Sequence, residues 1–370
     1  MDRALGFREL VFSALGRYLP KQLPREWFVP ALTGVIVAAT LFPCDGTGAQ
    51  AFHALAVIAI SSLFFLQGAR MSREAVAAGM CNWRLHLGIG VTTFVLFPVL
   101  GLALLALFPT ALTPSLRIGL LFVCVLPSTV QSSIALTSIA GGEVAGAVCS
   151  ATASNLVGVV LSPMLLALLL RMRGGAMDLG GLWKILVELL LPFVAGHLLR
   201  PWIGSWADRN RKVLAVTDRG SILLVVYTAF SAAVVHGIWR QLPATTLVEL
   251  VMFDCLLLAG ALAMIRVGSR LLNLPQKDEV AMIFCGSQKS IVTGAPMAQL
   301  LFAAPVAGMI VLPIMLYHLL QLLLGAWLAR RFAAAPAAGA VTAPNLLPRW
   351  AFDGFQSRIR FAWQRLTSRA

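Results

Sequence analysis

The chain has 370 residues, of which 59% are apolar and 12% are Asp, Glu, Lys or Arg. That is about half the charged share of an average soluble domain, so the composition excludes a soluble globular protein of this length. The formal net charge of +14 and the mean hydropathy of +0.86 instead favour a protein that lies in lipid and carries its few cations at one membrane face.

Apolar stretches of membrane-spanning length recur along the chain. A bilayer core of about 30 Å requires about 20 apolar residues per helix. Ten such stretches are separated by charged residues or by Pro and Gly, which predicts an all-α polytopic membrane protein with ten transmembrane helices. They lie near residues 27–43, 50–67, 85–108, 116–139, 144–170, 181–200, 220–240, 246–265, 280–303 and 306–329.

The distribution of cations predicts the orientation of these helices. With the N-terminus in the cytoplasm, 23 of the 29 Lys and Arg residues lie on the inner side and five on the outer side. This bias favours cytoplasmic N- and C-termini and an even number of crossings. It also explains the net charge without a nucleic-acid partner. The one remaining cation, Lys289, lies within a predicted span.

Both ends of the chain are predicted to contact the cytoplasmic leaflet. Residues 1–26 have apolar residues at helical spacing among basic ones, which indicates an interfacial amphipathic segment. Residues 331–370 begin with a flexible Ala/Pro/Gly linker and continue as a basic amphipathic tail. Such a tail either lies on anionic lipid or is disordered.

An internal repeat divides the spans into two halves. The segments Gln131-Ser132-Ser133-Ile134 and Gln288-Lys289-Ser290-Ile291 lie 157 residues apart, in the fourth and ninth spans. We expect five-helix repeats over 27–170 and 171–330, the second inverted because five is odd. Pro and Gly near both segments predict spans that break near mid-membrane. Paired broken spans indicate a transport site; the alternative is that small residues merely permit close helix packing.

The broken segments carry a family resemblance. Leu126-Pro-Ser-Thr-Val-Gln-Ser-Ser133, residues 141–155 and Phe284-Cys-Gly-Ser-Gln-Lys-Ser290 resemble the bile acid:sodium symporter superfamily, in the branch of solute carrier family 10 member 7 and its bacterial relatives. The resemblance covers roughly 27–330. It implies a panel domain of spans 1, 2, 6 and 7 and a core domain of spans 3–5 and 8–10, with the two broken helices crossing in the core. It also implies a secondary transporter of a small organic anion, such as a sterol conjugate, in a bacterial inner (plasma) membrane.

The resemblance also implies where sodium ligands would fall. Phe284 stands where the symporters have an acidic ligand, and Thr93 stands where they have a third-span Gln. The loss of the carboxylate and the gain of Lys289 should weaken sodium binding by electrostatic repulsion. The implied sodium ligands are Ser132, Ser133, Gly146 and Ser150 for one ion, and Gln288 for a second.

Lys289 is the residue most expected to set the coupling. It lies 12 residues beyond Lys277, or about 18 Å along a helix, which is near the bilayer midplane. It acts either as a surrogate cation, bonded to Ser132, Gln288 or freed carbonyls, or as a group that loses its proton during the cycle. Snorkelling to an interface is the structural alternative. Asp254 either pairs with Lys289 or bonds a neighbouring hydroxyl.

The expected ligands are a small organic anion and the lipid bilayer, including anionic lipids, with no cofactor other than Na⁺ or H⁺ as the coupling ion. No paired carboxylates and no H-E-x-x-H motif occur, which argues against an enzyme. A second hypothesis is a membrane regulator of calcium homeostasis without solute transport. The predicted substrate- and ion-binding residues are Thr93, Ser128, Thr129, Gln131, Ser132, Ser133, Ser150, Asn155, Asp254, Ser287, Gln288, Lys289 and Ser290.

Overall fold

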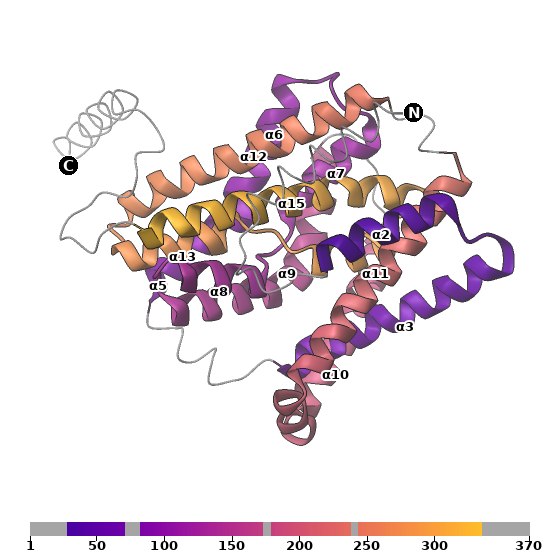
Figure 1. Cartoon of the computed structure of the whole chain (residues 1–370), viewed down its shortest axis with the longest axis horizontal. Coiled ribbons are helices and arrows are strands. Elements are labelled where there is room, and N and C mark those ends of the chain that lie inside the picture. The colour runs from indigo at the N-terminus through magenta and orange to yellow at the C-terminus, as the bar shows by residue number, and fades with distance from the viewer. Residues whose placement is uncertain (1–27, 71–81, 173–178, 238–242, 335–370) are drawn as a thin grey trace, which may run out of the picture. The chain divides into compact units, whose positions relative to one another are not determined.

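The computed structural model describes residues 28–70, 82–172, 179–237 and 243–334, and the regular elements in these ranges are all helical (Figure 1). The predicted interfacial segment 1–26 and all but the first four residues of the predicted tail 331–370 lie outside the described residues. The helices are α2 (Phe28–Leu41), α3 (Gly46–Arg70), α5 (Trp83–Val91), η1 (Thr92–Leu96), α6 (Phe97–Leu107), α7 (Pro114–Val125), α8 (Val130–Ile139), α9 (Val144–Met172), α10 (Leu179–Arg209), α11 (Arg211–Val235), α12 (Ala244–Leu271), α13 (Gln276–Ser287), α14 (Ile291–Leu301) and α15 (Ala304–Ala334).

Each of the ten predicted stretches falls on one helix or on consecutive helices. Within the described ranges, six helices are long and apolar enough to cross a membrane, or seven if the bent pair α7–α8 counts as one span. The prediction of an all-α, multi-pass membrane protein is therefore confirmed. The arrangement as ten crossings in two inverted repeats stays a prediction.

The chain divides into two units. The first contains α2, α3, α10 and α11 with residues 294–312, and the second contains α5 to α9, most of α12, α13 and the larger part of α15. The panel and core domains that the family resemblance implied stay a prediction, and residues 244–247 and 294–312, which it implied as core, cluster with the first unit. The broken segments around Leu126 and Lys289 both belong to the second unit.

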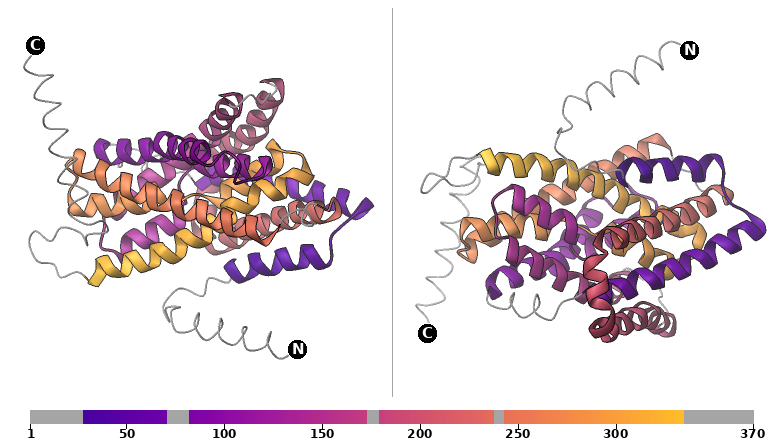
Figure 2. Two further views of the ribbon diagram at one scale, coloured as in Figure 1. Left: turned by 90° about the horizontal axis from the view of Figure 1, so that it is seen from above. Right: turned by 60° about the horizontal axis from the view of Figure 1, so that its bottom comes forward.

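In the first unit, α3 runs beside α10 and α11 (Figure 2). Two glycines allow α3 and α10 to touch. A Cβ atom on Gly68 would lie 2.0 Å from the carbonyl oxygen of Phe193, and one on Gly196 would lie 1.9 Å from that of Phe65. Since no side chain larger than hydrogen fits at either position, backbone contact holds this helix pair together, as is common for helices in lipid.

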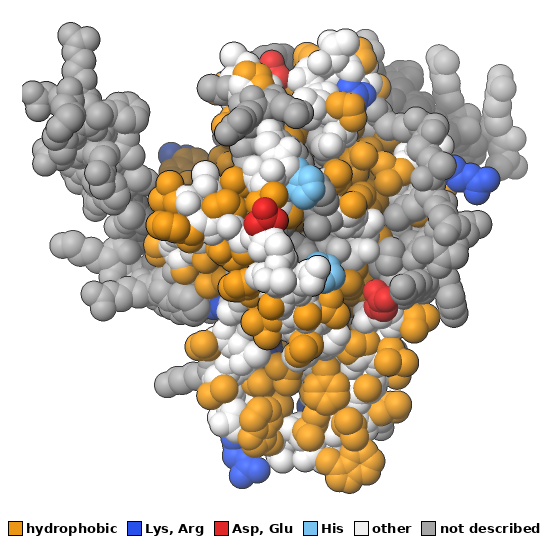
Figure 3. All heavy atoms as spheres, turned by 90° about the vertical axis from the view of Figure 1, so that its right-hand side faces the viewer, with side chains coloured by type: hydrophobic (Ala, Val, Ile, Leu, Met, Phe, Trp, Pro, Cys, Tyr) orange, Lys and Arg blue, Asp and Glu red, His pale blue; other side chains and the backbone are white. Residues whose placement is uncertain are grey.

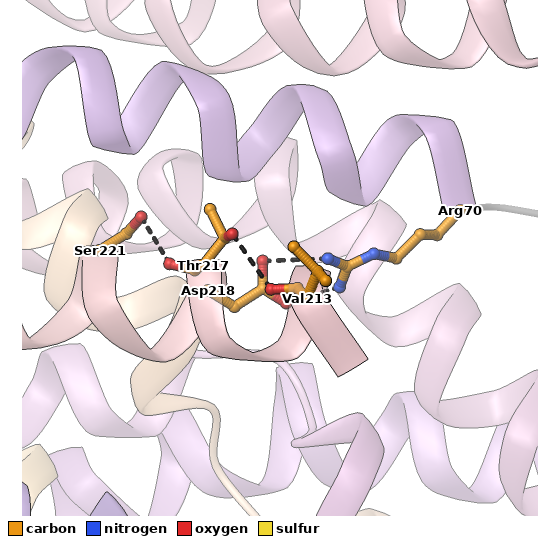
Figure 4. A network of polar contacts seen from close by, with 5 residues as sticks. All are labelled: Arg70, Val213, Thr217, Asp218 and Ser221. Atoms are coloured by element: carbon orange, nitrogen blue, oxygen red, sulfur yellow. Dashed lines mark hydrogen bonds and ion pairs between the residues drawn. The ribbon is translucent and has the colours of Figure 1, made fainter. Parts of the chain in front are cut away.

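An ion pair joins the end of α3 to α11 in the same unit (Figure 4). Nη1 of Arg70 lies 2.5 Å from a carboxylate oxygen of Asp218, whose side chain is buried. On α11, the hydroxyl of Thr217 donates to the carbonyl of Val213, and that of Ser221 donates to the carbonyl of Thr217. The pair fixes the C-terminal end of α3 against α11.

In the second unit, polar contacts hold the start of α13. Asn82, the residue before α5, donates from Nδ2 to Asp278 at 2.7 Å, and Arg266 on α12 pairs with Glu279 at 2.6 Å. Both carboxylates lie in the first turn of α13, where negative charge complements the helix dipole. These contacts position the helix whose other end forms the break described below.

The surface agrees with a protein that lies in lipid. Apolar side chains cover much of the face drawn in Figure 3, and charged ones are few and scattered there. Large apolar side chains such as Phe42 and Trp202 are 75% and 73% exposed. Contiguous apolar surface of this kind is unfavourable in water and is solvated by acyl chains in a membrane.

Candidate functional site

Two helices of the second unit are interrupted, and their interruptions lie against each other. The axes of α7 and α8 differ by 58° across residues 126–129, and α13 and α14 are separated by residues 288–290. The backbone N–H of Ser290 donates to the carbonyl of Pro127 at 2.9 Å, and the hydroxyl of Thr129 donates to the carbonyl of Lys289 at 2.8 Å. Backbone groups that leave the helices are thus satisfied within the protein, as the membrane interior requires.

The ammonium of Lys289 is enclosed where the two breaks meet. Its side chain is fully buried, and Nζ donates to the carbonyl oxygens of Thr93 and Cys124 at 3.0 Å and of Leu126 at 2.8 Å. The ring of Phe97 lies beside it, with its centroid 4.0 Å from Nζ. Carbonyls at the C-terminal end of α7 lack helical partners and carry partial negative charge, which stabilises the cation.

A π-helical turn supplies the third of these carbonyls. In η1 the backbone N–H of Phe97 bonds the carbonyl of Thr92, five residues earlier. The carbonyl of the next residue, Thr93, is used by Lys289, while the buried hydroxyl of Thr93 has no hydrogen-bond partner. Single π turns occur frequently at functional sites. This turn was not predicted from the sequence.

Hydroxyls on α8 connect the first break to α13. Oγ of Ser132 donates to Oε1 of Gln288 at 2.8 Å, and Oγ of Ser133 donates to the carbonyl of Phe284 at 3.2 Å. Oγ of Ser133 also lies 3.2 Å from Oγ of Ser128. The predicted polar residues of the fourth and ninth spans therefore interact directly with one another.

Three polar residues of α15, which sequence reasoning did not select, complete the second break. Oε1 of Gln321 accepts the backbone N–H of Lys289 at 2.7 Å, and its Nε2 donates to the carbonyl of Lys289 at 2.9 Å. The same Nε2 lies 2.7 Å from Nδ1 of His318, and the hydroxyl of Tyr317 donates to the carbonyl of Ser287 at 2.8 Å. Tyr317, His318 and Gln321 stand at positions i, i+1 and i+4 of an otherwise apolar span, and this spacing could have indicated them from the sequence.

Helix α9 contacts both interruptions. Asn155 donates from Nδ2 to the carbonyl of Ser128 at 2.5 Å and accepts from the hydroxyl of Thr293 at 2.9 Å. The backbone N–H of Ser128 donates to Oγ of Ser154 at 3.1 Å. One amide side chain therefore bonds a residue of the first break and the first turn of α14.

Some predicted residues lie elsewhere. Gln131 is exposed, and Ser150 is buried with its Oγ 2.6 Å from Nδ1 of His86. Asp254 is buried on α12, neither carboxylate oxygen has a hydrogen-bond partner, and it makes no ion pair with Lys289. The predicted residues that do meet around the breaks are Thr93, Ser128, Thr129, Ser132, Ser133, Asn155, Ser287, Gln288, Lys289 and Ser290.

The side-chain oxygens near the breaks are already bonded to other protein groups. Sodium prefers several hard oxygens and a compensating carboxylate, yet Ser132 and Gln288 bond each other, and Ser133 bonds the backbone of α13. Phe284 is buried with its ring edge-on to that of Phe332. Among the described residues, no group of three or more His, Cys, Asp or Glu side chains is placed to hold a metal ion.

A small cavity adjoins the second break. Its volume of about 10 Å³ is that of a single water-sized occupant. Its polar lining residues are Ser287 and Gln288 at the C-terminal end of α13 and Gln321 of α15, whereas α12 contributes only leucines. The lining residues are Leu258, Leu262, Phe284, Ser287, Gln288, Gln321, Leu324, Gly325 and Leu328.

Apolar helices of membrane-spanning length around two joined interruptions are features of a membrane transporter rather than an enzyme. The chain belongs to the SBF-like CPA transporter family, whose model matches residues 26–334. The resemblance to the bile acid:sodium symporter superfamily is thereby confirmed, as is the prediction of a transporter and not an enzyme.

Similar proteins occur in bacteria and in animals. The chain is 49% identical to the putative symporter YfeH of Escherichia coli over 299 residues, 81% of this chain and 90% of that protein. It is 50% identical to an uncharacterised protein of Pseudomonas aeruginosa over 310 residues, 83% and 92% of the two chains. It is 27% identical to the sodium/bile acid cotransporter 7 of Rattus norvegicus over 323 residues, 83% and 92% of the two chains.

Proposed function

We propose that this protein is a secondary active transporter that moves a small organic anion, such as a sterol conjugate, across the bacterial inner membrane by alternating access. The observation that carries the proposal is the buried ammonium of Lys289 at the junction of two interrupted helices. The substrate class is supported by the similarity to a relative named sodium/bile acid cotransporter 7. The cation bias of the sequence supports cytoplasmic termini.

The electrostatics of the breaks favour an anionic substrate. Helices α8 and α14 both begin at the interruptions, at Val130 and Ile291, so two helix N-termini place partial positive charge there. Lys289 adds a full charge in a region of low dielectric, where its field is strong. A carboxylate or sulfonate group is the chemical complement of this arrangement.

We further propose that Lys289 takes the place of a coupling sodium ion. The ammonium already holds three carbonyl oxygens, and the hydroxyls that the resemblance implies as sodium ligands bond other protein groups. A second cation nearby would be repelled without a carboxylate to offset it. Transport by this protein should therefore not require sodium, in contrast to the relatives named as sodium cotransporters.

The test is solute uptake into liposomes that contain the purified protein. The probes are taurocholate and a panel of simpler carboxylates and sulfonates, each measured with a sodium gradient, with a proton gradient and with neither. Accumulation that does not depend on sodium supports the proposal. Absence of uptake for every anion would contradict it and favour the alternative of a membrane regulator of calcium homeostasis, which a calcium-flux measurement on the same liposomes addresses.

A further inference from the structure

One buried carboxylate in the second unit has no partner. The described residues include three buried Asp side chains: Asp218 pairs with Arg70, Asp278 accepts from Asn82, and Asp254 has no hydrogen bond to either oxygen. Asp254 is also fully shielded from solvent. An isolated ionised carboxylate in an apolar interior is strongly destabilised. Asp254 therefore differs from Asp218 and Asp278, whose charges are stabilised by a bonded partner.

Asp254 lies on the side of α12 that faces the small cavity. Leu258 and Leu262 line that cavity and follow Asp254 at intervals of four residues, so all three share one face of the helix. The adjacent residue Phe253 packs edge-on against Phe108, which caps the C-terminal end of α6, and Leu100 of α6 lies against Gly260 of α12. The carboxyl group is therefore enclosed by the helices of the second unit rather than by lipid.

Two titratable side chains from other helices lie close enough to Asp254 to interact with its charge. Cys124 of α7 and Tyr317 of α15 are within electrostatic range of its carboxylate, and on α12 itself the neighbouring residue is Cys255. Both link Asp254 to the site described above, because the carbonyl of Cys124 accepts from Lys289 and the hydroxyl of Tyr317 bonds Ser287. No cation forms an ion pair with Asp254 in the described part of the chain.

We propose that Asp254 is a proton-binding site of the transport cycle, and that it is protonated in the conformation described here. In the loading step, one carboxylate oxygen forms an O–H bond with a proton from water; in the unloading step, that bond breaks and the proton returns to water on the other side. No electrons are exchanged. The movement of the proton across the membrane rests on the proposed transport function. The protonation of Asp254 in this conformation does not.

Protonation of Asp254 would set the charge available to an anion. When Asp254 is protonated and neutral, the positive charge of Lys289 is not offset, and it attracts an anionic substrate. With the carboxylate, the two side chains sum to zero and the attraction is lost. Binding of the proton therefore favours binding of the anion, and the reciprocal effect follows from linkage. The expected mode of coupling is cotransport of one proton with the anion.

Infrared difference spectroscopy tests the protonation state without any substrate. Purified protein in lipid is titrated across neutral pH, and the carboxylic-acid C=O stretching band is followed. We expect a band at neutral pH that is missing from the Asp254→Asn variant and retained in Glu249→Gln, which changes a half-exposed carboxylate on the same helix. A spectrum of Asp254→Asn identical to that of the wild type would overturn the proposal.

A transport measurement on the same preparations separates this proposal from the proposed function. With taurocholate as the probe, an imposed proton gradient should drive accumulation by the wild type and by Glu249→Gln. Asp254→Asn, which imitates the protonated acid and should elute as a folded protein in size exclusion, should exchange taurocholate without accumulating it. Gradient-driven accumulation by Asp254→Asn would overturn proton binding at this residue. If no preparation transports taurocholate, the proposed substrate fails, and the infrared band alone decides whether Asp254 is protonated.

Discussion

The ammonium of Lys289, carried by the break between α13 and α14, is 2.8 Å from the carbonyl oxygen of Leu126 in the break between α7 and α8. The cation of one interruption thus satisfies the freed backbone of the other, and the same ammonium donates to the carbonyl of Cys124, two residues before Leu126. These contacts satisfy backbone groups of both breaks, and each such group left unpaired in a membrane interior would be destabilised by several kcal/mol. It also explains why the substitution of this lysine should have large effects.

Lys289→Ala should abolish transport or create a dependence on added sodium. The substitution removes the fixed charge and leaves three carbonyl oxygens without a donor, which is an oxygen-rich vacancy suited to a small cation. Uptake into liposomes with and without sodium measures the effect. The matched control is Lys277→Ala, because Lys277 is an exposed lysine of α13, the helix that precedes the break carrying Lys289. Sodium-independent transport at the wild-type rate by Lys289→Ala would refute a role for its charge.

Sodium should not stabilise the wild-type protein. Exchange of K⁺ for Na⁺ at constant ionic strength should leave the melting temperature unchanged, because Ser132 and Gln288 bond each other. An ion present at 100 times its dissociation constant would instead add about 2.7 kcal/mol of stability. Thermal unfolding of the purified protein in detergent measures this directly. A rise in melting temperature specific to Na⁺ would show that the oxygens near the breaks do bind the ion.

The helical regions were predictable from the sequence because lipid permits few structures. A backbone that crosses hydrocarbon must satisfy its own hydrogen bonds, so apolar length alone indicates a helix. Pro127 and the Gly-Ser-Gln-Lys segment around Lys289 also indicated both interruptions, because Pro removes a donor and Gly weakens a helix. The helix boundaries agree to within a few residues at most ends, although α10 continues to Arg209, nine residues beyond the predicted end.

The partners of Lys289 were not predictable to the same degree. Freed carbonyls were one of three expected partners, but their identity depends on a π turn at Thr93 and on how α7 packs, neither of which a sequence pattern encodes. Gln321 was missed because it lies 32 residues from Lys289 and meets it only through tertiary packing. Asp254 was considered as an ion-pair partner, and its lack of any partner emerges only in three dimensions.

Gln321→Ala should destabilise the second break. The variant leaves the buried backbone N–H and carbonyl of Lys289 without the side chain that bonds both, and an unsatisfied buried polar group is destabilising by about 1–3 kcal/mol. A lower melting temperature and faster proteolysis are expected. Gln131→Ala removes an exposed amide on α8 and should change stability by less than about 0.5 kcal/mol. Equal melting temperatures for the two variants would contradict the assigned role of Gln321.

Gly68→Ala should destabilise the first unit through the contact of α3 with α10. The added methyl group would lie 2.0 Å from the carbonyl oxygen of Phe193, a backbone atom that cannot rotate away, so the helices must separate. Overpacking of this kind is typically destabilising by about 1–3 kcal/mol. Gly48→Ala is the matched control, since it lies on the same helix with no atom within 4 Å of the new methyl group. That control should be neutral or stabilising, because Ala is favoured over Gly in helices by up to about 1 kcal/mol. The comparison of the two melting temperatures isolates the contact from helix propensity, and a Gly68→Ala protein as stable as Gly48→Ala would mean that the two backbones do not touch.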